Sequence, residues 1–261
     1  MSETLISPPH PREGDRPRRP FVLIIALALA GVLSTVGGGV AIRAHLTRKP
    51  TADEIAAAGQ KEIASRWRAL TAGEIFPARA DETSSEGSVI DSMTPTLSAL
   101  RVGIAPRVSC AEGFDHPLAE VLVRHGCRTV LRATYVDPSG TLVTTLGVAV
   151  MPDAKRADGA ETDFSASLGV HGVEERYGVR AVPFPGTVAA GFGDSLRQDF
   201  SYENGHTPYL FFRSSGWITD RATRLETVVV NTFAFARVAL DKVILRLATT
   251  NEPCERRGVK C

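Results

Sequence analysis

The chain lacks an excess of charge of either sign. Its 261 residues include 30 basic and 29 acidic side chains, which give a formal net charge of +1. Domains that bind nucleic acids usually carry a basic excess or a basic stripe along one face. The charge balance therefore predicts that the protein has no nucleic-acid partner.

The sequence also lacks the motifs that hold metals and nucleotides. Its four cysteines include no Cys-x-x-Cys pair, which structural zinc sites usually contain. The glycine-containing stretch 186–193 does not end in the Lys-Ser/Thr of a phosphate-binding loop. His171, Glu174 and Glu175 match no metal-ligand spacing, and we interpret them as part of a solvated loop. We therefore expect no metal and no cofactor.

A complete catalytic set is missing as well. Phe192–Leu196 reads FGDSL and resembles the signature of the GDSL lipases and esterases, which implies that Ser195 is a nucleophile. The family also has an Asp-x-x-His and a Gly-x-Asn-Asp block, and neither occurs here; His206 is the only histidine after Ser195. Because a serine needs an adjacent base, we interpret the string as a turn leading into a strand at Leu196. An envelope hydrolase that uses Ser195 or His171 stays as an alternative.

One stretch lacks charge altogether. Phe21–Ile42 holds 22 consecutive uncharged residues. As a helix it would be about 33 Å long, enough to cross a hydrocarbon core of about 30 Å. It is longer than a signal-peptide core of ~7–15 residues, and Ile42 stands where a cleavage site needs a small residue. We predict an uncleaved transmembrane helix after a disordered cytoplasmic tail, residues 1–20. Small residues at every fourth position make self-association through the span an open alternative.

Cysteines are few, and all of them follow the predicted span. They are Cys110, Cys127, Cys254 and Cys261. An even number of cysteines behind an anchor indicates an oxidising compartment. We therefore expect a single-pass protein of the cell membrane, with a cytoplasmic N-terminus and an extracytoplasmic domain. Four cysteines allow three connectivities; we prefer Cys110–Cys127, which brackets a short predicted helix, with Cys254–Cys261 as the second bridge.

The remaining sequence alternates between helical and strand patterns. Helices are expected over about 52–71, 115–126 with Asp115 as its cap, and 233–248. Strands are expected over 128–136, 141–151, 179–184, 196–202 and 209–215. The first two strands should form a hairpin around the turn Asp137–Gly140, and Glu203–His206 reads as a second turn. Residues 77–92 and 152–162 read as polar loops. These patterns predict an α+β fold with a mainly antiparallel sheet of about four to six strands, flanked by helices and stabilised by disulfides.

This pattern divides the chain into four parts. After the tail and the span, residues 43–92 form a juxtamembrane helix and linker, and residues 93–261 form the extracytoplasmic α+β domain. Three stretches within 110–221 follow in order, CRTVLRATYVDPSGTLVTTLGVAVMPD, VRAVPFPGT and PYLFFRSSGWITDR. This order of strands and turns resembles uncharacterised actinobacterial membrane proteins with one span and an external domain. That resemblance implies an architecture and a location but no activity.

The sequence thus favours a non-enzymatic binding or scaffolding domain in the cell envelope. Its partners would be the lipid bilayer, through Phe21–Ile42, and an envelope protein, the wall or a small molecule. A domain that senses a signal and passes it through the span to a separate cytoplasmic protein is a further alternative.

Overall fold

The computed structural model divides the chain into two units, Met1–Thr51 and Ala52–Cys261. The residues that it describes are 24, 25, 27, 31, 51–82, 97–171, 177–218 and 231–249, with only the backbone described over 167–171. In the first unit residues 24, 25, 27 and 31 are helical and Thr51 is not, and Ile24, Ile25 and Leu27 are exposed. Among the described residues no helix is both long and apolar enough to span a bilayer. The predicted tail and most of the predicted span lie outside these residues.

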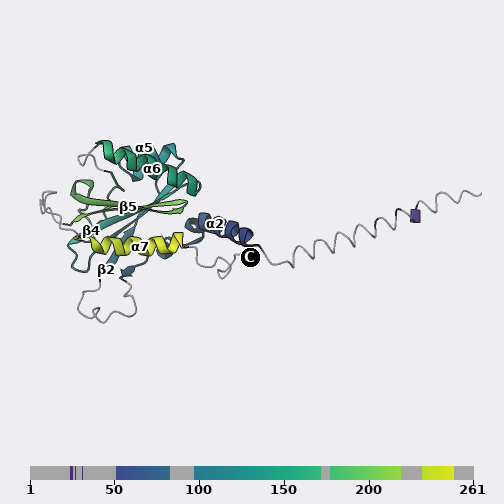
Figure 1. Ribbon diagram of the computed structural model, residues 1–261. Helices are drawn as coiled ribbons and strands as arrows, with labels where there is room; N and C mark the ends of the chain where they lie inside the picture. Colours follow the sequence, from purple (N-terminus) through teal and green to yellow (C-terminus); the bar gives the residue numbers. More distant parts are fainter. Residues whose placement is uncertain are drawn as a thin grey trace, which may run out of the picture. The chain divides into compact units, whose positions relative to one another are not determined.

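The second unit is built on one antiparallel sheet of six strands (Figure 1). The strands are β1 (Arg79–Asp81), β2 (Ser98–Ile104), β3 (Thr129–Val136), β4 (Leu142–Val150), β5 (Arg197–Thr207) and β6 (Tyr209–Trp217). Their spatial order is β1-β2-β3-β4-β6-β5, and every neighbouring pair is antiparallel. The helices are α2 (Ala52–Ala69), α3 (Ala72–Ile75), α4 (Cys110–Gly113), α5 (His116–Arg124), α6 (Ala154–His171) and α7 (Ala234–Ala248). The predicted α+β fold with helices around an antiparallel sheet is therefore confirmed.

The helices cover both faces of the sheet. Figure 1 shows α5 and α6 on one side and α7 on the other. Helices α2, α3 and α7 share a core with the sheet side chains Tyr135, Tyr209 and Phe211. Helices α4, α5 and α6 share a second core, in which Phe212 meets Phe114 at a ring-centroid distance of 4.8 Å. Burial of both faces explains why β3 and β4 carry apolar side chains on both sides, and the threonines Thr134, Thr144 and Thr145 are buried among them.

Helix α2 is the first packed helix of this unit. Its C-terminal half buries Ile63, Arg66 and Trp67, whereas most of the first half is exposed. The Tyr209 hydroxyl donates to the Ile63 carbonyl at 2.6 Å, which ties the helix to the first residue of β6. Burial raises the pKa of Tyr209 to about 12, so this hydroxyl keeps its proton at neutral pH. The second half of α2 therefore belongs to the packed core of this unit.

The predicted hairpin is confirmed, with strands within one residue of their expected bounds. Asp137 fixes the turn, since its carboxylate accepts from the backbone N–H groups of Ser139, Thr141 and Leu142. Gly140 takes a φ of +67°, which a residue with a side chain rarely adopts. Turn chemistry and strand pattern thus agree in this hairpin.

Three predictions about loops and turns were wrong. Residues 152–162 are not a polar break, because α6 begins at Ala154 with the Asp153 carboxylate accepting from the Arg156 N–H at 2.8 Å. Within the expected loop 77–92, residues 79–81 form the edge strand β1. The turn expected at 203–206 lies inside β5, which bulges there and continues to Thr207. The sequence pattern also did not indicate β2.

The expected strand 179–184 is an irregular segment instead. We call residues 177–196 the strap; it lies against the sheet, where Thr134 Oγ1 donates to the Val182 carbonyl at 2.8 Å. Gly147 leaves room for it, because a Cβ there would lie 2.6 Å from a methyl carbon of Val179. Polar side chains and a glycine of the sheet thus hold the strap without a regular strand ladder.

One arginine locks the end of the strap. The Arg197 guanidinium binds the Asp115 carboxylate at 2.7 and 2.8 Å and donates to the Val179 carbonyl at 3.0 Å. Asp115 occupies the N-cap position of α5, as expected, but its side chain makes no hydrogen bond to the helix. Its carboxylate serves the ion pair with Arg197 instead.

Candidate functional site

A pocket of about 230 Å³ lies between α3, the end of β2 and β3. Most of its wall is apolar, and Ile75, Phe76 and Leu131 are buried there. The lining residues are Ala72, Ile75, Phe76, Ile104, Ala105, Pro106, Arg107, Leu131 and Arg132. None of them carries a hydroxyl, thiol, imidazole or carboxylate. The pocket therefore has the surface of a binding site and no group for nucleophilic or carboxylate acid–base chemistry.

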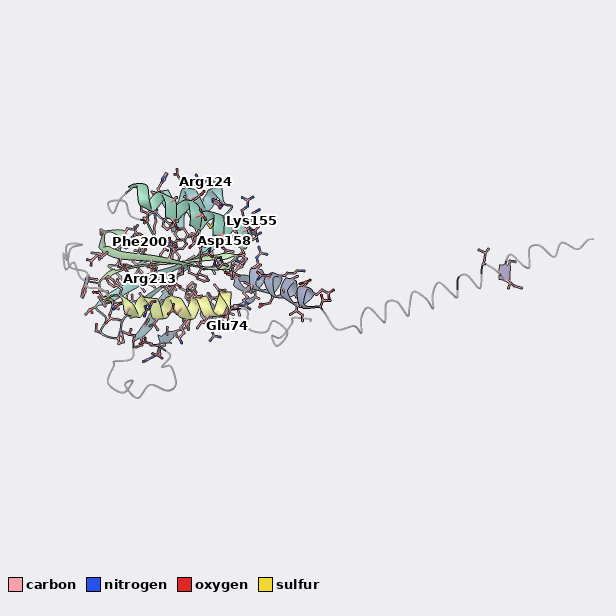
Figure 2. The ribbon with its side chains drawn as sticks, in the orientation of Figure 1. Glu74, Arg124, Lys155, Asp158, Phe200 and Arg213 are labelled. Atoms are coloured by element: carbon pink, nitrogen blue, oxygen red, sulfur yellow. A yellow bond between two sulfur atoms is a disulfide. The ribbon has the colours of Figure 1, made fainter. Side chains whose placement is uncertain are left out.

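A capping box fixes the α3 wall of the pocket. The Thr71 N–H donates to the Glu74 carboxylate at 2.7 Å, and the Glu74 N–H donates to Thr71 Oγ1 at 3.3 Å. The hydrogen bond from the Thr71 backbone is the main reason that the pKa of Glu74 (labelled in Figure 2) lies below its ordinary value. After the helix, the Phe76 carbonyl accepts from Arg101 and the Pro77 carbonyl accepts from the Tyr135 hydroxyl. These four contacts hold a helix of one turn in place.

The opposite wall forms where β2 separates from β3. The Ala105 N–H still donates to the Arg132 carbonyl at 2.9 Å, and the ladder resumes only with the bridge between Val108 and Val130. Between them Pro106 has no N–H to donate. The chain therefore turns away from the sheet at this point. Leu131 of β3 lines the pocket there.

Arg107 brings a permanent positive charge to the pocket. Its guanidinium carbon lies 5.3 Å from the centre of the Trp67 ring, and that of Arg68 lies 4.6 Å from the same ring. Trp67 is 7% exposed and belongs to the core that α2 shares with the sheet. Within the described part of the chain, neither arginine has an acidic partner at ion-pair distance. Arg107 alone of the two lines the pocket.

Ser195 does not form a catalytic site with His206. It is exposed in the 3-10 helix η1 (Asp194–Leu196), which leads into β5, so the interpretation as a turn before a strand is confirmed. The neighbouring Asp194 carboxylate accepts from the Ala181 N–H at 2.8 Å and pairs with Arg197 at 3.1 Å. His206 lies at the other end of β5, where its Nδ1 is 3.1 Å from Asp158, also labelled in Figure 2. At ~3.3 Å per strand residue, roughly 30 Å separates the two side chains.

The other candidate residues fall at the edge of the described chain or beyond it. His171 is the last residue of α6, and its side chain lies outside what the structure describes. Glu174 and Glu175 lie outside the described residues. Over the described ranges, no three His, Cys, Asp or Glu side chains gather closely enough to hold a metal ion.

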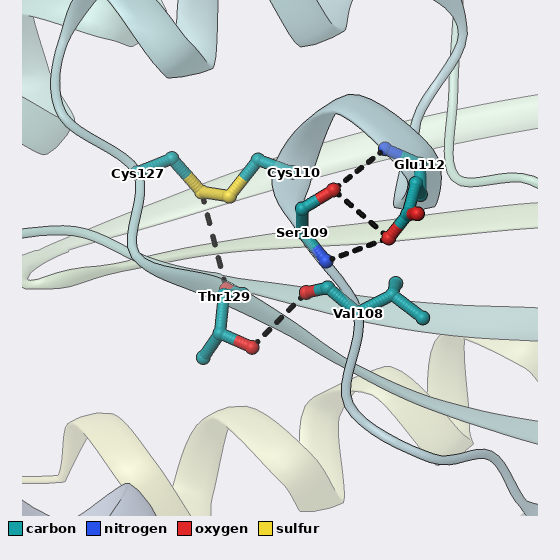
Figure 3. Close-up of a disulfide and its surroundings, with 6 residues drawn as sticks. All are labelled: Val108, Ser109, Cys110, Glu112, Cys127 and Thr129. Carbon is teal, nitrogen blue, oxygen red and sulfur yellow. Dashed lines mark hydrogen bonds between the residues drawn. A yellow bond between two sulfur atoms is a disulfide. The ribbon is translucent and has the colours of Figure 1, made fainter.

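The preferred disulfide is confirmed. Cys110 and Cys127 are bonded with their Cα atoms 6.2 Å apart, and Figure 3 shows the bridge beside the start of β3. Cys110 begins α4, whose capping box joins Ser109 to Glu112. The bridge thus ties the segment that carries α4 and α5 to the sheet. The second expected pair, Cys254–Cys261, lies outside the described residues.

An acidic pair, Glu203 of β5 and Asp241 of α7, was not predicted from the sequence. Burial raises the pKa of Glu203 on β5 above its ordinary value, and nearby Asp241 of α7 raises it further. Burial likewise raises the pKa of Asp241, whereas Arg237 lowers it. Arg213, labelled in Figure 2, pairs with Asp199 on the same sheet face. The spacing of Arg237 and Asp241 at i and i+4 is the one sign of this cluster in the sequence.

Comparisons with protein-family models, with curated proteins and with solved structures each gave no match.

Proposed function

We propose that this protein is a binding domain outside the cytoplasm, anchored to the cell membrane by Phe21–Ile42. The observation that carries the proposal is the Cys110–Cys127 bridge in the unit that follows this uncharged stretch. Disulfides persist in oxidising compartments and are rare in the cytosol. The length of the uncharged stretch supports a membrane span, and the exposed apolar side chains Ile24, Ile25 and Leu27 suit a lipid environment.

Binding, without catalysis, is the role that the pocket supports. Its lining offers apolar surface and arginine, and it lacks a nucleophile or a carboxylate. Its walls are held by the Thr71–Glu74 capping box and by the hydrogen bond from Tyr135 to the Pro77 carbonyl. Walls that are fixed before the ligand arrives reduce the ordering cost of binding. We therefore propose that a ligand of the cell envelope occupies this pocket.

Thiol labelling of living cells tests the location. Val188 in the strap is 57% exposed, so Val188→Cys would place an accessible thiol on the domain. Cys254 and Cys261 are replaced by serine, and the native bridge is kept. A membrane-impermeant maleimide should label Val188→Cys in intact cells. The matched control, Ser2→Cys in the predicted tail, should be labelled only after lysis.

Two results would overturn the location. One is that the maleimide labels Val188→Cys only after the cells are broken. The other is protein that stays soluble with Phe21–Ile42 intact, because an anchored chain must fractionate with membranes.

A further inference from the structure

We infer that the pocket between α3 and the end of β2 binds a short apolar chain or ring that carries an anionic group, with Arg107 as the partner of the anion. This inference rests on the proposed binding role and gives it a ligand class. It follows from three features of the pocket: its size, its apolar wall and the position of its charge.

The size and the wall select the apolar part of the ligand. A dry apolar cavity of about 150 Å³ accepts one benzene molecule, and this pocket measures about 230 Å³. Ile75, Phe76 and Leu131 present buried apolar side chains to it, and Ile104 and Pro106 complete the wall. A strongly hydrated ligand such as a sugar would lose its water against this surface without regaining hydrogen bonds. A short acyl chain or an aromatic ring makes no hydrogen bonds to water, so it gives up none when it enters the pocket.

The positive charge of Arg107 determines which head group the ligand carries. A guanidinium is permanently charged and has five N–H donors, which suit a carboxylate or a phosphate. Arg107 both lines the pocket and lies over Trp67, and it has no acidic partner at ion-pair distance within the described residues. The lining contains no carboxylate that would attract a cation. An anion is therefore the charge that this pocket favours.

Trp67 gives the proposal an internal reporter. The chain has two tryptophans, so Trp217→Phe leaves Trp67 as the only one. Because Arg107 contacts the Trp67 ring, an anion that engages Arg107 should change the Trp67 fluorescence. The full chain, in phosphatidylcholine nanodiscs, is titrated with octanoate, octyl phosphate, octanol and octylammonium. Empty nanodiscs correct for partition of each probe into lipid.

Three variants separate the pocket from its surroundings. Arg107→Gln removes the charge of Arg107 and leaves Arg132, the other arginine of the lining, in place. Ala72→Phe fills the pocket from an exposed position on α3. Arg68→Gln is the matched control, because it removes the other guanidinium from Trp67 without touching the pocket lining. A photoreactive octanoate gives a readout that does not depend on fluorescence; it should attach within 72–76 or 104–107.

We expect saturable binding of octanoate or octyl phosphate, with the preferred head group telling a carboxylate ligand from a phosphate ligand. Loss of a charged hydrogen bond corresponds to about tenfold weaker binding or more, so Arg107→Gln should bind at least about that much more weakly. Arg68→Gln should retain the affinity, and Ala72→Phe should abolish binding and photolabelling.

Several results would overturn the inference, and each of them can be distinguished from a failure of the proposed function. If octanol or octylammonium binds as tightly as the anions, the anionic class is wrong. If Arg107→Gln changes nothing, Arg107 is not the partner of the anion. Provided that Ala72→Phe still abolishes binding, the binding role then stands. If Ala72→Phe leaves the response intact, the pocket is not the site. The membrane location is tested separately by the labelling of Val188→Cys.

Discussion

Arg66 should be among the most sensitive positions in the domain. Its side chain is 2% exposed and lies between α2 and the end of α7. It donates to the carbonyls of Leu247 and Thr249 at 3.1 and 2.6 Å, and it pairs with Glu62 at 2.7 Å. The last carbonyls of a helix have no partner within the helix. Arg66 supplies that partner and neutralises the negative end of the α7 dipole.

Arg66→Met keeps the length and apolar stem of the side chain and removes its charge. Breaking one side of a fully buried ion pair costs about 3–5 kcal/mol. The Glu62 side chain is 17% exposed and can regain some water. We therefore expect a loss of about 2–4 kcal/mol, which at this size lowers the Tm by roughly 5–15 °C. Adding Glu62→Gln should recover part of the loss, since the carboxylate that lost its Arg66 partner is then absent as well.

Urea unfolding of the full chain in a mild detergent, followed by tryptophan fluorescence, measures this loss. Arg68→Met is the control, because Arg68 is an exposed arginine on the same helix and surface changes usually cost within about 0.5 kcal/mol. If Arg66→Met is no more destabilising than Arg68→Met, the contact between α2 and α7 does not hold the domain together as described.

Three further predictions concern stability. Replacing Cys110 and Cys127 together by serine should cost about 3 kcal/mol in urea unfolding, and adding a reductant to the variant should then have no further effect. Gly216→Ala would set a methyl group against a backbone carbonyl of η1, so it should cost about 3 kcal/mol, whereas Gly193→Ala has open space and should stay within about 0.5 kcal/mol. Burial raises the pKa of Glu203 above 4.5 in the folded state, so its ionisation lowers stability as the pH rises from 4.5 through the folded pKa. Glu203→Gln should flatten that part of a stability–pH curve, and an unchanged slope would contradict this assignment.

Local chemistry made some elements predictable. The hairpin around Asp137–Gly140 has its strand pattern and its turn residues side by side in the sequence, so both indicate the same structure. Helix α6 was missed because two of the residues that it buries, Ala157 and Ala160, are small, so its apolar face appears weak among charged neighbours. Residues 179–184 were expected to form a strand, but Val179 forms an isolated bridge to Phe114, and Val182 hydrogen-bonds to the side chains of Thr134 and Thr145.

The pocket depends on contacts that no local pattern encodes. Its walls come from α3, β2 and β3, and Arg107 meets Trp67 across 40 positions of sequence. The capping box of Thr71 and Glu74 is readable as Ser/Thr-x-x-Glu, yet it indicates a helix start and says nothing about the neighbouring pocket. Folding brings Arg107 to an apolar recess, and only the structure gives that position.

The redox state of Cys110 and Cys127 in living cells tests the central claim most directly. Cells are lysed in a thiol-blocking reagent, and the two residues are scored as bonded or free by peptide mapping. The full chain should carry the bridge, and a variant that lacks Phe21–Ile42 should stay in the cytoplasm with both thiols reduced. Free thiols in the full chain, or a bridge that forms equally without the uncharged stretch, would contradict an anchored domain outside the cytoplasm.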